Sequence, residues 1–257
     1  MIVYPSDFLT LAEQLADAAG ELARRYFRTN LSIYSKDDQT PVTRADRESE
    51  ATMRAILSAN VPEHGIIGEE YGPERNDAEW VWVLDPIDGT KSYVTGVPLF
   101  GILVSLVHRG RPVIGIIDQP ILGERWIGVE GMVSQFKGKD ARTRPCAGLT
   151  NAWLYASTPH MFDDTEFSRF EALRQCCREA RYGCDCYAYG ILASGHIDLV
   201  VEAGLKPYDF CALAPVVTGA GGIISDWQGA PVTIESAGQI VAAGDARMHE
   251  AALSMLF

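Results

Sequence analysis

Two carboxylates, Asp85 and Asp88, directly follow a run of aromatic and aliphatic residues. The run is Trp-Val-Trp-Val-Leu over 80–84, and Pro86 stands between the two acids. Because Pro86 has no backbone N–H for a ladder hydrogen bond, we expect the strand to end here and to hold Asp85 at its carboxyl end, where α/β proteins place their sites. Carboxylate oxygens suit a hard cation such as Mg²⁺. The pair therefore predicts a metal site.

The next two residues, Gly89 and Thr90, form a turn that can face an anion. Gly89 allows the backbone to come close to a ligand, and the amides of Gly89, Thr90 and a following helical turn can point toward a phosphate. Carboxylates beside such a turn make chemical sense when metal ions lie between them and the anion. The alternative is an ordinary turn in which the aspartates only accept hydrogen bonds from backbone amides.

Three further acids can join this site. Glu69 and Glu70 follow the apolar run at 66–68, where a solvated charge pair is the alternative. Asp209 stands at the expected start of a helix, where an N-cap is the alternative. Like charges gathered in one place repel one another unless cations neutralise them. No cluster of Lys or Arg accompanies these acids in the sequence, so metal ions are the expected cations.

Composition narrows the class of protein. The 257 residues contain 22 Lys and Arg against 34 Asp and Glu, a net charge of −12, and 47% are hydrophobic. This length fits one large domain or two small lobes that share a core. An acidic chain repels phosphate backbones and anionic membrane surfaces, so we expect neither a nucleic-acid partner nor a membrane partner. A phosphorylated small metabolite would need a metal ion between it and such a chain.

The sequence also bears on the cellular compartment. No apolar run approaches the roughly 18 residues of a membrane span, and the first residues lack the basic stretch of a secretory signal. Six cysteines are too few for a disulfide scaffold and lack the Cys-x-x-Cys spacing of zinc sites. We therefore expect a cytoplasmic protein, with an organelle stroma as the alternative if a transit peptide has been removed.

The elements that must position these acids can be read from the apolar periodicity. In the first half we expect helices over 7–28 and 44–59, strands over 65–68 and 80–84, a hairpin of 101–108 with 112–118, and a hairpin of 124–129 with 133–136. In the second half we expect strands over 152–156, 196–201, 222–226 and 239–243, and helices over 164–180, 186–194, 208–220 and from 246 onward. We interpret 1–145 as an α+β lobe and 146–257 as a more regularly alternating α/β lobe, packed in layers.

These residues resemble a known family. Gly68-Glu69-Glu70, the run Asp85-Pro-Ile-Asp-Gly-Thr90 and Tyr208-Asp209 ahead of 219–222 are similar to the motifs of the inositol monophosphatase superfamily, Mg²⁺-dependent and lithium-sensitive phosphatases. The match is collinear from about Lys36 to Gly222, and the central motif is highly specific. The resemblance implies the α/β class, in a layered αβαβα sandwich of the inositol monophosphatase and fructose-1,6-bisphosphatase type. It also implies a homodimer.

The resemblance implies a role for each acid and two or three Mg²⁺ ions per site. One ion is expected on Glu69, Asp85 and the carbonyl of Ile87, a second on Asp85, Asp88 and Asp209, and a third, loosely held, on Glu69. The implied nucleophile is a metal-bound water, and the implied catalytic residues are Asp46, Thr90 and Glu69. In this scheme Thr90, paired with Asp46, polarises the water. Lys36 falls where the family has a lysine near the metal waters, although a solvated surface lysine is the alternative.

Four stretches look like the histidinol-phosphate phosphatase branch of the superfamily. They are 90–101, 113–120, 185–189 and 202–209. In this interpretation the substrate-binding residues are Asp88, Gly89, Thr90, Asp185 and Glu202. The amides of Gly89 and Thr90 face the phosphate, while Asp185 and Glu202 attract the ammonium group of L-histidinol phosphate. The alternatives are a helix N-cap for Asp185 and, as in inositol-cleaving relatives, a sugar-hydroxyl acceptor for Glu202.

The predicted activity is the hydrolysis of L-histidinol phosphate to L-histidinol and phosphate, a step of histidine biosynthesis. An inositol monophosphate phosphatase or a sugar or nucleotide bisphosphate phosphatase is the alternative within the same class. A regulatory protein that kept the fold and lost turnover is the alternative from another class. The intact acid set argues against the regulatory protein, since a non-catalytic descendant needs none of it.

Overall fold

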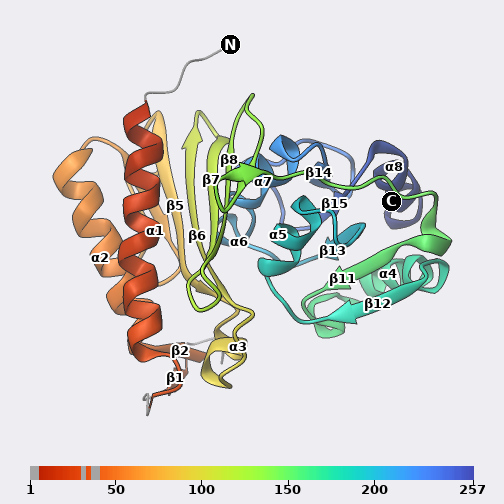
Figure 1. Cartoon of the computed structure of the whole chain (residues 1–257), viewed down its shortest axis with the longest axis horizontal. Coiled ribbons are helices and arrows are strands. Elements are labelled where there is room, and N and C mark those ends of the chain that lie inside the picture. Colours follow the sequence, from red (N-terminus) through yellow and green to blue (C-terminus); the bar gives the residue numbers. More distant parts are fainter. Residues whose placement is uncertain (1–5, 30–32, 36–40) are drawn as a thin grey trace.

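The chain folds into five alternating layers of helices and sheets (Figure 1). The computed structural model describes residues 6–29, 33–35 and 41–257. An eight-stranded sheet and a five-stranded sheet form the second and fourth layers. The outer helices are α1 (Ser6–Tyr26) and α2 (Arg44–Asn60) on one side and α4 (Asp164–Cys176) and α8 (Ala246–Leu256) on the other, and the middle helices are α5 (Tyr187–Ala193), α6 (Pro207–Phe210) and α7 (Leu213–Gly219). This architecture confirms the predicted α/β class and layered sandwich.

The eight-stranded sheet has the order β10-β9-β8-β7-β6-β5-β3-β4. Its strands are β3 (Gly65–Gly68), β4 (Gly72–Glu74), β5 (Trp80–Asp88), β6 (Gly101–His108), β7 (Arg111–Gln119), β8 (Glu124–Val129), β9 (Gln135–Phe136) and β10 (Lys139–Asp140). Its neighbouring strands are antiparallel except for the parallel pair of β3 and β5. The two predicted hairpins, β6 with β7 and β8 with β9, are confirmed.

The five-stranded sheet has the order β12-β11-β13-β15-β14. Its strands are β11 (Trp153–Ala156), β12 (Glu179–Tyr182), β13 (Leu199–Glu202), β14 (Ile223–Asp226) and β15 (Ile240–Ala243). Strand β11 runs parallel to both of its neighbours, whereas β15 is antiparallel to β13 and β14. A separate short ladder joins β1 (Ile33–Ser35) to β2 (Pro41–Thr43). The helix α3 (Thr90–Val94) follows β5 directly.

The strand β5 continues past the proline that was expected to end it. Asp85 pairs with Leu103 and Asp88 pairs with Gly101, so two residues of β5, Pro86 and Ile87, oppose one residue of β6. Because Pro86 cannot donate to the ladder, the chain bulges there and pairs again at Asp88. The bulge keeps both carboxylates at the same end of the sheet.

Other elements differ from the sequence prediction for local reasons. The helix predicted over 164–180 ends at Cys176, and 179–182 forms the edge strand β12, whose short Glu-Ala-Arg-Tyr sequence contains no β-branched residue that would favour a strand. The helix predicted over 208–220 is divided into α6 and α7. Pro215 has no N–H to donate to the carbonyl of Cys211, which accounts for the interruption.

A continuous apolar core joins the two sheets. Val83, Leu103 and Ile117 of the first sheet pack in one buried cluster with Tyr189 and Val216 of the middle helices. All six cysteines are free, and four of them are buried, as the sparse cysteine pattern predicted. Within the described ranges, no helix combines the length and the apolar character that crossing a membrane requires.

Candidate active site

Three aspartates converge where β5 meets the middle helices. Asp85 and Asp88 come from the carboxyl end of β5 and Asp209 comes from α6, and one oxygen of each lies within 4.8 Å of the others. Asp85 is buried, with 1% of its surface exposed, and the other two are half-buried. The structure therefore brings together three of the acids that the sequence singled out.

A backbone amide fixes each of these carboxylates. The amide of Ile87 donates to Asp85 Oδ1 at 3.0 Å, within the bulge itself. The amide of Cys186, just before α5, donates to Asp88 Oδ2 at 2.5 Å. The amide of Lys206, the N-cap residue of α6, donates to Asp209 Oδ2 at 2.6 Å, so Asp209 caps the helix from its third position and is not the N-cap of the alternative interpretation. Capping uses one oxygen of Asp209 and leaves the other for the cluster.

Burial and mutual repulsion raise the pKa values of the three aspartates. For Asp85 burial is the first cause, followed by the charges of Glu69, Asp88 and Asp209. For Asp88 burial is followed by the charges of Asp185 and Asp209. Burial raises the pKa of Asp209 to about 7. A cluster of this kind favours protons or cations in its midst.

The donor set fits Mg²⁺ on its chemistry. Carboxylate oxygens held a few ångströms apart are the ligands that hard divalent cations take. In the described part of the chain, no Lys or Arg side chain forms an ion pair with Asp85, Asp88 or Asp209. A bound divalent cation would supply the missing positive charge.

Glu69 stands beside this cluster at the end of β3. Its amide donates to the carbonyl of Leu84 on β5 at 3.3 Å. Its negative charge contributes to the raised pKa values of Asp46, Asp85 and Asp209. Glu69 thus lies near both the aspartates and the pair described next.

Thr90 and Asp46 meet although they are far apart in the sequence. Thr90 Oγ1 donates toward Asp46 Oδ1 at 3.4 Å and lies 3.1 Å from the carbonyl oxygen of Ile87. Asp46 is fully buried, and its Oδ2 accepts from the Thr43 amide at 2.9 Å and from the Thr43 hydroxyl at 2.5 Å. Burial raises the pKa of Asp46. The capping box that starts α2 therefore also orients this carboxylate.

A cavity of about 160 Å³ adjoins the aspartates. Acidic and polar residues share its wall with apolar ones, and the lining is Asp88, Ser157, Met161, Asp185, Cys186, Tyr189, Glu202, Leu205, Asp209 and Leu213. None of these described lining residues is basic. The two acids predicted to recognise the substrate, Asp185 and Glu202, therefore face the same space as Asp88 and Asp209.

Glu202 is buried and held by three hydrogen bonds. Its Oε1 accepts from the Ser157 amide at 2.8 Å and from the Ser157 hydroxyl at 2.5 Å. Its Oε2 accepts from the Tyr189 hydroxyl at 2.9 Å. Burial raises the pKa of Glu202, and the Ser157 and Tyr189 hydrogen bonds oppose that rise. Sequence reasoning missed the roles of both partners, although Ser157 follows the end of β11 as Asp85 stands near the end of β5.

Asp185 lies in an unusual backbone segment. Gly183, Cys184 and Asp185 have φ angles of 89°, 91° and 46°, a conformation that non-glycine residues rarely adopt. This segment brings the Asp185 carboxylate against Gly89, where an added Cβ would lie 2.6 Å from Oδ2. Ser92 Oγ donates to the same oxygen at 3.2 Å. Gly89, with φ at 88°, is thus required both for its conformation and for the room it leaves.

Lys36 lies outside the described residues, so its predicted position near the metal waters stays a prediction. Ile87 and Gly89, also predicted site residues, lie near the end of β5 and directly after it.

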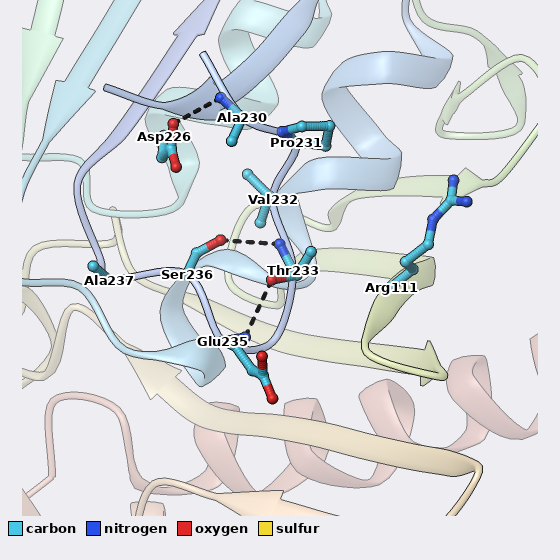
Figure 2. Close-up of a pocket in the computed structure, with 9 residues that line it drawn as sticks. All are labelled: Arg111, Asp226, Ala230, Pro231, Val232, Thr233, Glu235, Ser236 and Ala237. Atoms are coloured by element: carbon cyan, nitrogen blue, oxygen red, sulfur yellow. Dashed lines mark hydrogen bonds between the residues drawn. The ribbon is translucent and has the colours of Figure 1, made fainter. Parts of the chain in front are cut away.

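A larger cavity of about 710 Å³ lies elsewhere, near the start of β7 (Figure 2). Figure 2 shows that the segment 226–237, which forms much of the cavity wall, is held by hydrogen bonds between its own residues. Asp226 accepts from the Ala230 amide at 2.8 Å, Ser236 from the Thr233 amide at 3.0 Å, and Thr233 Oγ1 from the Glu235 amide at 3.3 Å. Among the predicted site residues that the structure describes, none lines it. Four of the predicted site residues, Asp88, Asp185, Glu202 and Asp209, line the smaller, acidic cavity instead.

Comparisons with known proteins agree with the geometry. Residues 5–256 match the inositol monophosphatase family. The chain is 48% identical to the bifunctional phosphatase IMPL2, chloroplastic, of Arabidopsis thaliana, over 97% of this chain and 75% of that protein. It is 34% identical to a histidinol-phosphatase of Chlorobaculum parvum over 91% of each chain. Its structure matches an inositol monophosphatase from Zymomonas mobilis with a TM-score of 0.91 and 48% identity over 99% of both chains.

Proposed function

Because this chain belongs to the inositol monophosphatase family, we propose that it is a Mg²⁺-dependent phosphomonoesterase whose substrate carries a positive charge, most fittingly L-histidinol phosphate. The observation that carries this proposal is the acidic cavity beside the three aspartates. Asp185 and Glu202 line it, and its described lining contains no basic side chain. A cationic ammonium would be attracted there and would form charge-assisted hydrogen bonds with the acids, whereas a neutral polyol offers only the weaker bonds of neutral hydroxyl donors.

We assign the metal ligands as Glu69, Asp85, the Ile87 carbonyl, Asp88 and Asp209. When bound, Mg²⁺ lowers the pKa of water and neutralises charge on the phosphate. The chain's own part is to hold these oxygens at fixed spacing, which the amides of Ile87, Cys186 and Lys206 do.

We propose that Thr90 and Asp46 take up the proton that the attacking water loses. The Thr90 hydroxyl has one proton, which points to Asp46 or to the Ile87 carbonyl, so its oxygen keeps a lone pair for a water in the site. Burial raises the pKa of Asp46 and makes it a better proton acceptor. Asp46 can therefore receive the proton through Thr90.

The phosphate is proposed to lie over the turn of Gly89 and Thr90, with the alcohol part of the ester in the acidic cavity. On the predicted division of the chain, 1–145 supplies most metal ligands, and 146–257 supplies Asp209 and the two substrate acids. The apolar side chains Met161 and Leu205 on the cavity wall suit the carbon skeleton and ring of histidinol.

A phosphate-release panel tests the proposal. L-histidinol phosphate, inositol 1-phosphate, fructose 1,6-bisphosphate and adenosine 3′,5′-bisphosphate are compared by kcat/KM, with Mg²⁺ and with excess chelator. We expect L-histidinol phosphate to be the best substrate and all turnover to stop in chelator. A higher kcat/KM for inositol 1-phosphate would overturn the substrate proposal, and no turnover of any ester would favour the regulatory alternative.

Assembly and location stay proposals. We propose a homodimer, which light scattering on the purified protein tests directly. We also propose a cytoplasmic location. The Arabidopsis relative is named chloroplastic, so fractionation of the source cell is the deciding measurement.

A further inference from the structure

Glu50 is a carboxylate that the proposed reaction does not use, and it is fully buried on α2. Its Oε2 accepts from the amide of Glu70 at 2.6 Å. Its Oε1 accepts from the amide of Tyr71 at 3.2 Å and from Arg54 Nε at 2.8 Å. A charge is expensive to bury unless it is paired and hydrogen-bonded. These donors meet that requirement.

The two backbone amides that donate hydrogen bonds to Glu50 belong to the turn that begins with Glu69. This turn connects β3 to β4. At its first residue, the Glu69 amide donates to the carbonyl of Leu84 on β5. The carboxylate fits closely, because a Cβ added to Gly68 would overlap it. The backbone of Glu69 is thus fixed by β5 on one side and by α2 on the other.

Arg54 completes the connection between α2 and this turn. Its guanidinium pairs with Glu50, donates to the carbonyl of Gly72 and lies 3.6 Å from Glu74 Oε2. Its side chain is only 15% exposed. A guanidinium stays charged at any working pH and presents several donors in a fixed plane. The pair therefore ties the helix to both ends of the turn.

The same helix holds Asp46, four residues before Glu50. That spacing is one helical turn, about 6 Å along a rigid axis. We propose that Glu50 and Arg54 are positioning residues: through them α2 sets the Glu69 carboxylate in register with Asp46 and Thr90, and so sets the affinity for Mg²⁺. This inference rests on the proposed role of Glu69 as a metal ligand.

Two substitutions test the inference. Glu50→Gln places an NH₂ group against a backbone N–H donor whichever way its amide is turned, and Arg54→Lys keeps the charge but loses the planar donors. Residues that orient metal ligands typically change metal affinity by roughly 10–100-fold. We expect Mg²⁺ binding, measured by calorimetry without substrate, to weaken by about that factor in both variants. With saturating Mg²⁺, kcat for p-nitrophenyl phosphate should recover to within a few-fold of wild type.

A matched control and a reference variant make the outcomes distinct. Glu48→Gln changes a half-buried glutamate two residues away on the same helix, which accepts from Tyr26 and Arg44, and should bind Mg²⁺ as wild type does. Glu69→Gln should bind Mg²⁺ at least as weakly as Glu50→Gln. If Glu69→Gln binds Mg²⁺ as tightly as wild type does, Glu69 is not a metal ligand and the inference is refuted together with that assignment. If only Glu69→Gln binds weakly, the ligand assignment stands and the positioning role is refuted. Should Glu50→Gln fail to fold by circular dichroism, Arg54→Lys decides in the same way.

Discussion

Replacing Asp209 by Asn should make the metal-free protein more stable while weakening its response to Mg²⁺. Asp209 accepts one hydrogen bond, from the Lys206 amide, and an Asn side-chain oxygen can accept the same bond. What the substitution removes is a negative charge in a half-buried cluster that contains Asp85 and Asp88. The charge is unfavourable without a cation, so its removal should help the metal-free fold.

The magnitude follows from the pKa of Asp209, which burial raises from 3.8 to about 7. Each unit of pKa difference between the folded and unfolded states corresponds to about 1.4 kcal/mol, so the full penalty at pH 8 is on the order of 4 kcal/mol. Partial solvent access reduces this, and we expect a gain of about 2–4 kcal/mol. In a chain of this size 1 kcal/mol shifts Tm by about 2–4 °C.

The stability gained by Asp209→Asn should increase with pH. A carboxyl group whose pKa is raised on folding contributes no penalty below its unfolded pKa, and its penalty grows as the pH rises from the unfolded to the folded pKa and is constant above that. The advantage of Asp209→Asn should therefore be absent near pH 4, grow between about pH 5 and 7 and be complete at pH 8. In saturating Mg²⁺ the order should reverse, because wild type gains binding free energy that the variant loses.

Urea unfolding at pH 4, 6 and 8, in chelator and in Mg²⁺, measures these differences. Asp226→Asn is the matched control, since that aspartate also accepts from backbone amides but lies outside the cluster. Equal stability of Asp209→Asn and wild type at pH 8 in chelator would refute the argument from repulsion. Equal stabilisation of both proteins by Mg²⁺ would refute Asp209 as a ligand.

Three further substitutions have defined outcomes. Asp85→Asn should abolish turnover while circular dichroism shows the native fold; full activity would remove Asp85 from the metal site. Thr90→Ala should lower kcat by roughly 10²–10⁴ while calorimetric Mg²⁺ binding stays close to wild type; normal turnover would make Thr90 only a turn residue. Asp185→Asn and Glu202→Gln should each lower kcat/KM for L-histidinol phosphate much more than for p-nitrophenyl phosphate, because loss of one partner of a buried charge pair costs roughly 2–5 kcal/mol. An unchanged ratio of the two kcat/KM values would show that these acids do not select the substrate.

The parts of the site that follow from short stretches of sequence could be predicted. The apolar run, Pro86 and the two aspartates specify the end of β5 with little help from the rest of the chain. Asp209 could be placed there only through the family resemblance. No local pattern indicates that α6 packs against β5.

The parts that depend on distant contacts escaped prediction. Tyr189 reads as an ordinary core aromatic, and only the packing of α5 on β13 brings its hydroxyl to Glu202. Glu50 reads as a polar residue on an amphipathic helix. Its role becomes visible only when the turn after β3 folds onto α2. Hydrophobic periodicity predicts which face of a helix is buried. It does not predict that a carboxylate such as Glu50 is buried with hydrogen-bond donors from a distant segment.

The junction between the two sheets has a consequence for folding kinetics. The Cys186 amide that fixes Asp88 comes from 98 residues further along the chain, and Asp209 arrives from later still. A folding nucleus made of the first sheet alone would therefore lack a complete set of acids. Interactions that form after the transition state change the unfolding rate and leave the folding rate almost unaltered. Mg²⁺ should accordingly lower the unfolding rates in a chevron plot and leave the folding rates almost unchanged, because the ion binds only after the chain has folded.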